Sequence, residues 1–289
     1  MIRPRLHRDE RGFTLLEMIV AVAIMVTVVS MLFGTFFRAR NEISRIGSLV
    51  NSRQSARATI QLIERDVRMS GSGWGKMTIN YSRNGTRDSL FGLNPGPGAG
   101  SNDSLRIIGA WSAATTTTAA FTVQANPITV ASVTGFAVND LFVITDGSSA
   151  HCFQITGINA GTKQISHANT SQWNVLPATW AFPASGYKVG SQLYKIDILS
   201  YYVDATNFRR PPLVRRSYGA SPLAVSYDVA KFQFWYRMQD GSLTRTPAVS
   251  GTNVAFIDKL RPVVYTTLSD PRHPTSTDSV WTEVRPRTF

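Results

Sequence analysis

An apolar run near the N-terminus constrains the fold of this chain more than any other feature. The run extends from Phe13 to Phe37, 25 residues that contain a single charged side chain, Glu17. As a helix it would measure about 37 Å, enough to cross a hydrocarbon core of roughly 30 Å with some tilt. A carboxylate that faces lipid costs at least about 2 kcal/mol. The sequence therefore predicts a membrane-spanning helix in which Glu17 has a polar partner.

The residues at the start of this run form a specific pattern. Four arginines precede Gly12, which opens the sequence G-F-T-L-L-E that ends at Glu17. This pattern resembles the signal of type IV prepilins and type II secretion pseudopilins. In that family a prepilin peptidase in the membrane cuts after the glycine and methylates the new N-terminal residue. The resemblance implies a cut between Gly12 and Phe13, N-methylation of Phe13, and a role for Glu17 in assembly with other minor and major pilins.

A physical argument for Glu17 stands beside the resemblance. Cleavage would leave a charged amine on Phe13, and residues four apart share a helix face. Glu17 can then pair with this amine in its own chain or with the amine of a neighbouring chain. The alternative is a plain signal anchor with Glu17 at the level of the lipid headgroups. A conventional secretory signal fits less well, because the A-x-A sequence of the apolar run, at 21–23, lies in its middle rather than after it.

The location of the protein follows from the resemblance and not from charge counting. Arginines stand on both sides of the apolar run, so the positive-inside rule does not decide which end is cytoplasmic. The resemblance implies a single span in the inner membrane with the globular part in the periplasm. It also implies later incorporation into a pilus outside the cell.

Helical periodicity continues beyond the apolar run. Apolar side chains recur at steps of three and four residues, at Ile43, Ile46, Val50, Ala56, Ile60, Ile63 and Val67. This spacing predicts one helix that continues to about Met69 and lays an apolar face on a globular domain. Glycines from Gly71 onward end it. The sequence from Asp66 to Gly71 resembles the Asp-x-Arg-x-x-Gly helix end of PilW-type minor pilins.

Short β-prone runs and turn sequences occupy the rest of the chain. Residues 71–104 are rich in turn formers, and the segment 94–100 is the clearest loop. A tight turn is predicted at Asp240-Gly241, and a hairpin of the kind inserted in PilW-type proteins at 139–156. The expected strands are 104–108, 121–124, 140–145, 151–156, 193–203, 213–218, 229–238, 260–268 and one near 280–287.

Together these elements predict an α+β fold, in which a long N-terminal helix packs on an antiparallel β-sheet domain as in an enlarged pilin. The expected divisions are a leader peptide, a transmembrane and assembly helix, an amphipathic helix, and a β-rich periplasmic or extracellular domain. Their ranges are 1–12, 13–37, 38–70 and 71–289. Phe232, Phe234 and Tyr236 alternate with more polar residues and are expected to face the core. Cys152 is the only cysteine, so packing alone holds the domain, and we expect Cys152 to be a small buried residue.

Patterns that carry chemistry are missing from the sequence. The four histidines are scattered, and neither a zinc-binding spacing nor a G-x-S-x-G sequence occurs. The glycines at 96–100 depart from the G-x-G-x-x-G pattern of phosphate-binding loops. The sequence therefore predicts a structural protein and not an enzyme, with no catalytic residues, metal or cofactor.

Basic residues outnumber acidic ones, and the formal net charge is +12. One cluster of four arginines surrounds Pro211-Pro212, with tyrosines and a phenylalanine nearby. Such a cluster can contact an anionic partner, including single-stranded nucleic acid. The competing interpretation is a basic sheet edge that discourages association between edges. The four residues are Arg209, Arg210, Arg215 and Arg216.

The sequence as a whole predicts a PilW-type minor pilin that primes or caps assembly of a type IV pilus near its tip. The first alternative is a J-type pseudopilin of type II secretion, because both machines use the same N-terminal signal. The second alternative is a DNA or surface adhesin carried on the pilus.

Overall fold

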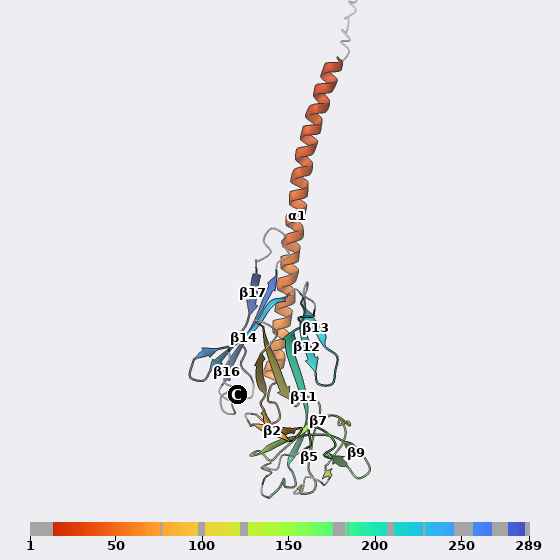
Figure 1. The fold of residues 1–289 in the computed structure, drawn as a ribbon, viewed down its shortest axis with the longest axis vertical. Coiled ribbons are helices and arrows are strands. Elements are labelled where there is room, and N and C mark those ends of the chain that lie inside the picture. Colours follow the sequence, from red (N-terminus) through yellow and green to blue (C-terminus); the bar gives the residue numbers. More distant parts are fainter. Residues whose placement is uncertain are drawn as a thin grey trace, which may run out of the picture. The chain divides into compact units, whose positions relative to one another are not determined.

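A computed structural model describes most of the chain as two compact units, Met1–Val50 and Asn51–Phe289. One long helix, α1 (Leu15–Arg68), begins in the first unit and ends in the second. The strands all belong to the second unit (Figure 1). The described residues are 14–75, 77–97, 102–121, 127–175, 183, 185–206, 211–227, 229–245, 257–267 and 277–286.

The helix has nearly the predicted bounds, and its C-terminal end has a clear physical cause. Gly71 has a φ of 69°, a left-handed conformation that glycine adopts without a steric penalty. Its N–H donates a hydrogen bond of 2.8 Å to the carbonyl of Ile108. The glycine therefore turns the chain out of the helix and joins it to the sheet.

Only the last part of α1 is buried by the chain itself. The buried helix residues are Ala56, Thr59, Ile60, Ile63, Asp66 and Val67, which follow the predicted spacing. Ile43, Ile46 and Val50, from the same predicted stripe, are instead 71%, 52% and 45% exposed. The expectation that the whole stripe packs on the domain is therefore wrong for these three residues in the single chain.

The strands in the described part of the chain form three sheets. Their bounds are β1 (Ile79–Arg83), β2 (Thr86–Leu90), β3 (Leu93–Pro97), β4 (Asp103–Gly109), β5 (Ala114–Thr116), β6 (Ile128–Thr129), β7 (Leu141–Thr145), β8 (Ala150–Gln154), β9 (Gly157–Asn159), β10 (Gln164–Ser166), β11 (Gln192–Val203), β12 (Leu213–Ser217), β13 (Leu223–Ser226), β14 (Val229–Met238), β15 (Leu243–Thr244), β16 (Ile257–Thr267) and β17 (Thr277–Trp281).

Strand β11 is the centre of the largest sheet, whose main path runs β13-β12-β11-β7-β8-β1-β2. The first half of β11 pairs with β5 and β7, and its second half pairs with β4 and β12. Two smaller sheets have the orders β6-β10-β9 and β15-β14-β16-β17. These pairings are antiparallel except for β1 with β8. The α+β prediction is confirmed.

Most predicted strands are present, but the region 71–104 was predicted incorrectly. It contains β1, β2 and β3 in place of continuous turns. Strand β3 includes Pro95 and Pro97 and occupies part of the predicted loop at 94–100. It pairs with β4 alone, so it is an edge strand, where a residue that lacks an N–H is tolerated.

Smaller differences occur at other elements. Phe121 forms only an isolated bridge with Tyr187, and residues 122–124 of that predicted strand lie outside the described residues. The last strand, β17, precedes most of the predicted range 280–287. The hairpin of β7 and β8 and the turn at Asp240-Gly241 are confirmed, and Gly241 has a φ of 85°.

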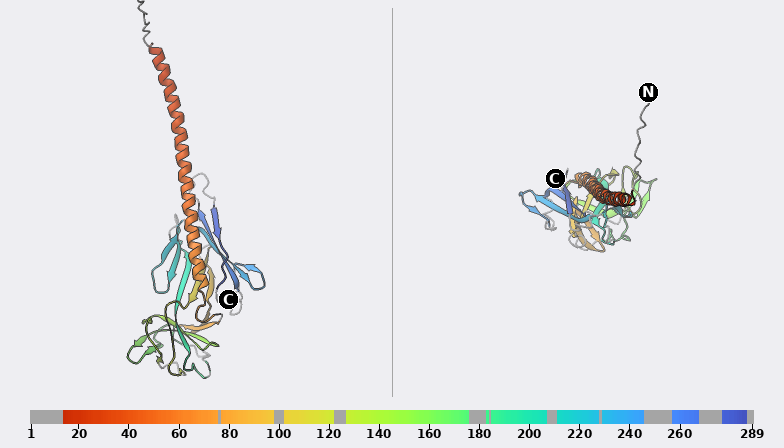
Figure 2. Two further views of the ribbon diagram at one scale, coloured as in Figure 1. Left: turned by 180° about the vertical axis from the view of Figure 1, so that it is seen from behind. Right: turned by 90° about the horizontal axis from the view of Figure 1, so that it is seen from above.

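The described residues of the second unit form three apolar cores. The first lies between the end of α1, the sheet of β14 and β16, and the half-sheet of β4, β11 and β12 (Figures 1 and 2). Phe232, Phe234 and Tyr236 are buried in it, as predicted. The other two cores lie on either side of the β7–β8 hairpin, where Cys152 is fully buried. We call residues 113–191, which contribute part of the second core and most of the third, the distal lobe.

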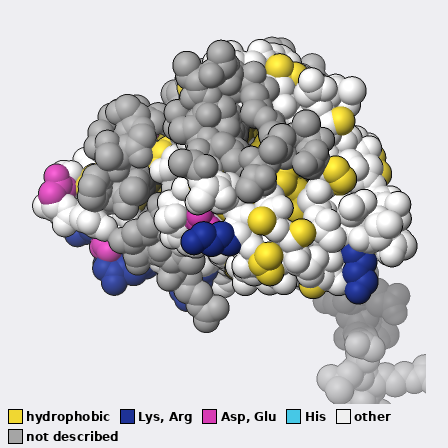
Figure 3. Space-filling model, turned by 90° about the horizontal axis from the view of Figure 1, so that it is seen from below, with side chains coloured by type: hydrophobic (Ala, Val, Ile, Leu, Met, Phe, Trp, Pro, Cys, Tyr) yellow, Lys and Arg dark blue, Asp and Glu magenta, His cyan; other side chains and the backbone are white. Residues whose placement is uncertain are grey.

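The distal lobe differs in charge from the rest of the protein. Its sequence contains only Asp140, Asp146, Lys163 and Lys188 as charged residues. Figure 3 shows that the described surface at this end of the unit is mainly uncharged. The positive charge of the chain is therefore concentrated outside the lobe.

Candidate processing and assembly site

The first turn of α1 is closed by reciprocal hydrogen bonds between Thr14 and Glu17. The backbone N–H of Thr14 donates to Oε2 of Glu17 at 2.9 Å, and its hydroxyl donates to the same oxygen at 3.0 Å. The N–H of Glu17 is 3.3 Å from the hydroxyl oxygen of Thr14. This arrangement is a capping box, and it places the carboxylate at the positive end of the helix dipole. Gly12 and Phe13 lie outside the described residues.

The surface that follows this cap is apolar and exposed. Leu15 is 80% exposed, Met31 70% and Phe36 61%. The helix is long and apolar enough to cross a membrane, and its most apolar segment is not buried by the described residues of the chain. Burial of these side chains therefore requires lipid or another molecule.

Hydroxyl groups within the apolar stretch are satisfied by the helix backbone. Thr27 donates to the carbonyl of Ala23, and Ser30 donates to the carbonyl of Val26 at 2.7 Å. Thr35 bonds in the same way to Leu32. Such back-bonding removes the cost of placing an unpaired hydroxyl in hydrocarbon. These three polar side chains are consequently compatible with a lipid environment.

The other end of α1 carries a buried carboxylate with several partners. Asp66 is fully buried, and its Oδ2 accepts hydrogen bonds from the hydroxyl of Tyr201 at 2.6 Å and from Nε of Arg215 at 2.9 Å. Arg65 bonds to the other oxygen. Burial, followed by the hydrogen bond to Asp66, raises the pKa of Tyr201. The network attaches the helix to β11 and β12.

The four arginines of the predicted basic cluster do not share one described surface. Arg209 and Arg210 lie outside the described residues. Arg215 and Arg216 are neighbours on β12, so their side chains point to opposite faces of the sheet. Arg215 turns inward to Asp66, whereas Arg216 is exposed and donates from Nε to the carbonyl of Ala220 at 3.2 Å.

One comparison with known protein families matches the N-terminal part of the chain. The model of the prokaryotic N-terminal methylation motif matches residues 7–33. Comparison with curated proteins and with solved structures gives no match.

Residues 7–33 therefore carry the N-terminal motif of the type IV prepilin and pseudopilin family, whose members are pilin-like structural proteins. The motif implies processing by prepilin peptidase and assembly with pilins. The apolar helix and the motif fit anchoring in the inner membrane before assembly.

Two features of this site escaped the sequence analysis. Thr14 and Glu17 have the Thr-x-x-Glu spacing of a capping box before an apolar run, so a local signal for their contact was present. The partners of Asp66 had no such signal, because Tyr201 and Arg215 are 135 and 149 residues away in the sequence. Within the described part of the chain, no group of three or more His, Cys, Asp or Glu side chains could hold a metal ion.

Proposed function

We propose that this protein is a PilW-type minor pilin that primes or caps type IV pilus assembly near the tip. In this proposal prepilin peptidase cuts between Gly12 and Phe13 and methylates the amine of Phe13. The helix from Phe13 to Phe37 then leaves the inner membrane and packs among the helices of other pilins. Contacts of this head-to-tail kind produce an open helical polymer.

The observation that carries the proposal is the contrast in burial along α1. The apolar half that bears the methylation motif is exposed throughout, whereas the last turns are buried in a large β-rich body. Because the apolar half of α1 is exposed in the single chain, it is available to pack against the helices of other subunits. The body contains two further apolar cores, to which the distal lobe contributes. Such a bulky body is easier to place at the end of a filament than in every repeat.

Glu17 is the residue that couples processing to assembly in this proposal. In the chain before cleavage its carboxylate accepts the N–H and the hydroxyl of Thr14. Cleavage adds a charged amine one residue earlier, at Phe13. A neighbour's amine can pair with Glu17 as the chain docks, which neutralises two charges that would otherwise be buried unpaired.

The experiment that tests processing is N-terminal sequencing and intact-mass measurement of the protein from cells with and without prepilin peptidase. We expect a chain that starts at methylated Phe13 only when the peptidase is present. A chain that starts at Met1 in both strains would contradict the proposal.

Replacement of Glu17 tests assembly separately from processing. Glu17→Val should leave the cut after Gly12 intact and lower the number of pili on the cell. Glu42→Gln is the matched control, since Glu42 lies on the same helix outside the apolar stretch and pairs with Arg45. Normal piliation in the Glu17→Val strain would refute the role of this carboxylate.

The second candidate is a J-type pseudopilin of type II secretion, which the same methylation motif supports equally. Deletion of the gene distinguishes the two machines. Loss of pili and of twitching motility is expected for a minor pilin, whereas loss of enzyme secretion with normal pili would favour the pseudopilin.

A further inference from the structure

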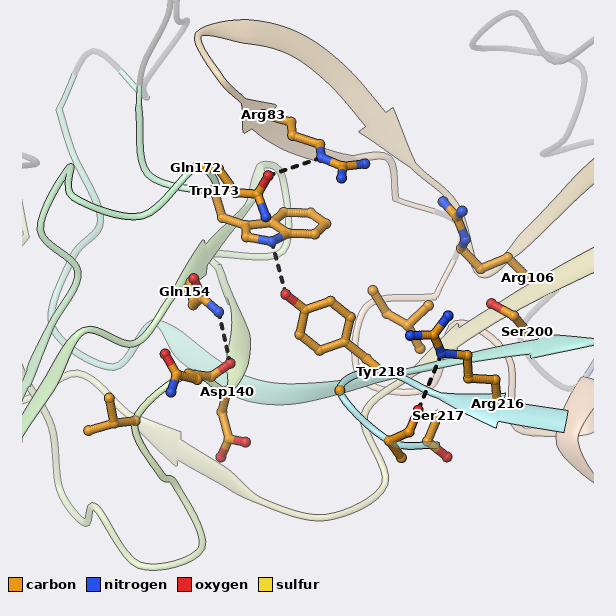
Figure 4. Close-up of a pocket in the computed structure, with 15 residues that line it drawn as sticks. Arg83, Arg106, Asp140, Gln154, Gln172, Trp173, Ser200, Arg216, Ser217 and Tyr218 are labelled. Carbon is orange, nitrogen blue, oxygen red and sulfur yellow. Dashed lines mark hydrogen bonds between the residues drawn. The ribbon is translucent and has the colours of Figure 1, made fainter. Parts of the chain in front are cut away.

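A pocket of about 790 Å³ lies in the second unit, where the sheet around β11 meets the distal lobe. Strands β1, β4 and β12 form one side of it, and the loops that precede β7 and follow β10 form the other. Figure 4 shows that side chains from both sides point into the space. The residues of this pocket are remote in sequence from the methylation motif. A ligand can bind there whether the protein belongs to a pilus or to a type II secretion system.

Three arginines line this pocket without an acidic partner. No carboxylate among the described residues forms an ion pair with Arg83, Arg106 or Arg216, and all three side chains are exposed. Elsewhere in the second unit most described arginines do pair with an acid. These paired residues are Arg65, Arg68, Arg215, Arg237, Arg245, Arg261 and Arg285. Three guanidinium groups that form no ion pair with an acid among the described residues therefore line one pocket.

The register of the sheet explains why two of these arginines are close. Ser200 on β11 lies directly opposite Arg106 on β4 and directly opposite Arg216 on β12. The two arginines therefore project from the same face of the sheet, on the two strands that flank β11, about 10 Å apart at the backbone. An anion that lies between them is attracted by both charges. The arrangement suits a ligand that supplies negative charge.

The guanidinium groups are also held in place. Nε of Arg83 donates to the side-chain oxygen of Gln172 at 3.4 Å, and Nε of Arg216 donates to the carbonyl of Ala220 at 3.2 Å. Each of these contacts uses Nε and leaves the two terminal nitrogens directed toward the pocket (Figure 4). The nitrogens of a guanidinium group bind carboxylates in a bidentate manner, through two parallel hydrogen bonds.

A second pocket continues the first. It has a volume of about 750 Å³ and shares Arg106, Ser200 and Arg216 with its neighbour. Tyr202 and Asn94 lie on its wall. Because the two arginines stand at the boundary of both pockets, one elongated ligand can occupy the two spaces and contact the same charges.

The uncharged lining of the first pocket distinguishes between kinds of anionic polymer. Single-stranded nucleic acid is held by successive bases stacked on exposed aromatic rings. Here Trp173 is only 8% exposed, and its indole N–H donates a hydrogen bond of 3.0 Å to the hydroxyl oxygen of Tyr218. Tyr218, 43% exposed, can cover one ring of a ligand. Gln154, Gln172 and Ser217 supply amides and a hydroxyl, which suit the hydroxyls of a sugar. The acidic lining residue Asp140 is paired with Lys195 at 2.8 Å.

From these contacts we infer that the paired pockets bind an acidic oligosaccharide. Its carboxylates lie against Arg83, Arg106 and Arg216, its hydroxyls bond to the amides and the serine, and one sugar ring covers Tyr218. The ligand class is a chain of sugar rings that bear carboxylates, such as a uronic acid polymer. No covalent step is involved.

The binding test uses the full-length chain in zwitterionic detergent micelles and a fluorescein-labelled hexamer of galacturonic acid. Fluorescence anisotropy should rise on binding and fall when unlabelled hexamer is added. Neutral maltohexaose, a sugar of the same length, should not displace the probe. Failure of the hexamer to bind at millimolar concentration would overturn the inference, as would equal competition by maltohexaose. Stronger competition by a thymidine dodecamer would replace the oligosaccharide with nucleic acid.

Two triple variants with the same net charge test whether the oligosaccharide binds at the paired pockets. The pocket variant is R83Q/R106Q/R216Q, and the control is R57Q/R68Q/R285Q, which has the same net charge and changes exposed arginines away from the pocket. We expect the pocket variant to weaken binding at least about tenfold because three charge-assisted contacts are lost. The control should change affinity by less than about twofold, since exposed charges at a distance are screened.

Folding of the variants is monitored by tryptophan fluorescence. If the triple pocket variant does not fold, Arg106→Gln alone should still weaken binding about threefold, because it contacts both pockets. Equal weakening by the pocket and control variants would show a nonspecific charge effect and would overturn the proposed site.

Discussion

The two ends of helix α1 obey the same local rules but are stabilised in different ways. Between Leu15 and Phe37 the large apolar side chains are exposed, whereas Ala56, Ile60, Ile63 and Val67 are buried by the sheets of the second unit. A helix needs a partner for its apolar surface, since burial of that surface supplies most of its stability. The second end has its partner within the chain. The first end depends on lipid or on other pilins.

The acidic residues of the two ends show the same division. Among the described residues Glu17 bonds to Thr14, three residues away, and remains exposed, so its carboxylate is accessible to a further charge. Asp66 is buried and bonded to Tyr201, Arg65 and Arg215. The two carboxylates on one helix therefore differ in burial and in the distance along the sequence to their partners.

The largest expected effect comes from removing the buried carboxylate. Asp66→Ala should lower the free energy of unfolding of the second unit by about 3–5 kcal/mol, because Arg215 would keep a charge without its partner. Tryptophan fluorescence during denaturant unfolding reports this unit, since all six tryptophans follow residue 51. Glu17→Ala is the control and should leave the same transition unchanged. Equal unfolding transitions for Asp66→Ala and Glu17→Ala would contradict the proposed difference between the two ends of α1.

A cavity in the core should have the next largest effect. Ile63 is fully buried, and Ile63→Ala should cost about 2–5 kcal/mol from lost burial and an unfilled cavity. Ile24, which is 58% exposed, is the matched residue in the first unit. Ile24→Ala should change the fluorescence-detected transition by less than about 0.5 kcal/mol. If Ile24→Ala is as destabilising as Ile63→Ala, the first unit must contribute to the stability of the second.

The stability of the second unit at alkaline pH tests the contribution of Tyr201, the partner of Asp66. Burial and the bond to Asp66 raise the pKa of Tyr201 in the folded state, so the stability that it contributes is complete below its unfolded pKa of about 10. This contribution is lost as pH rises above that value, with a slope of up to about 1.4 kcal/mol per pH unit. Tyr201→Phe should make the decline shallower and cost about 1 kcal/mol at neutral pH. An unchanged alkaline slope in the variant would show that Tyr201 is not linked to folding.

The smallest expected effect concerns the cap of the first end. Thr14→Ala removes the hydroxyl of the capping box and should cost about 1 kcal/mol of local helix stability. Hydrogen exchange of the first helical turn in micelles measures this change, and Thr14→Ser, which keeps the hydroxyl, is the control. Faster exchange in both variants would contradict the capping role. The unfolding of the second unit should be the same in both.

The regular elements could be predicted well where their signals are local. The apolar run, the three-and-four spacing and the glycines after Arg68 define α1 within two residues at its start and one at its end. Strand β14 has the predicted bounds, because its alternating aromatic residues form a strong period-two pattern. Strand β3 was missed because its prolines and glycine suggest a loop, and only its place at a sheet edge permits them.

By itself, the sequence determined the pilin class of this protein and the helix that defines it. The physical reason is that the methylation motif, the cap and the helical period involve residues within about one turn of each other. Only the tertiary structure decided which arginine is paired with a buried carboxylate and which lines a pocket. Arg215 and Arg216 are adjacent and chemically identical, but the pleat of β12 turns one toward Asp66 and the other toward a pocket shared with Arg83 and Arg106. Such pairing depends on strand order and register, which distant parts of the chain set together.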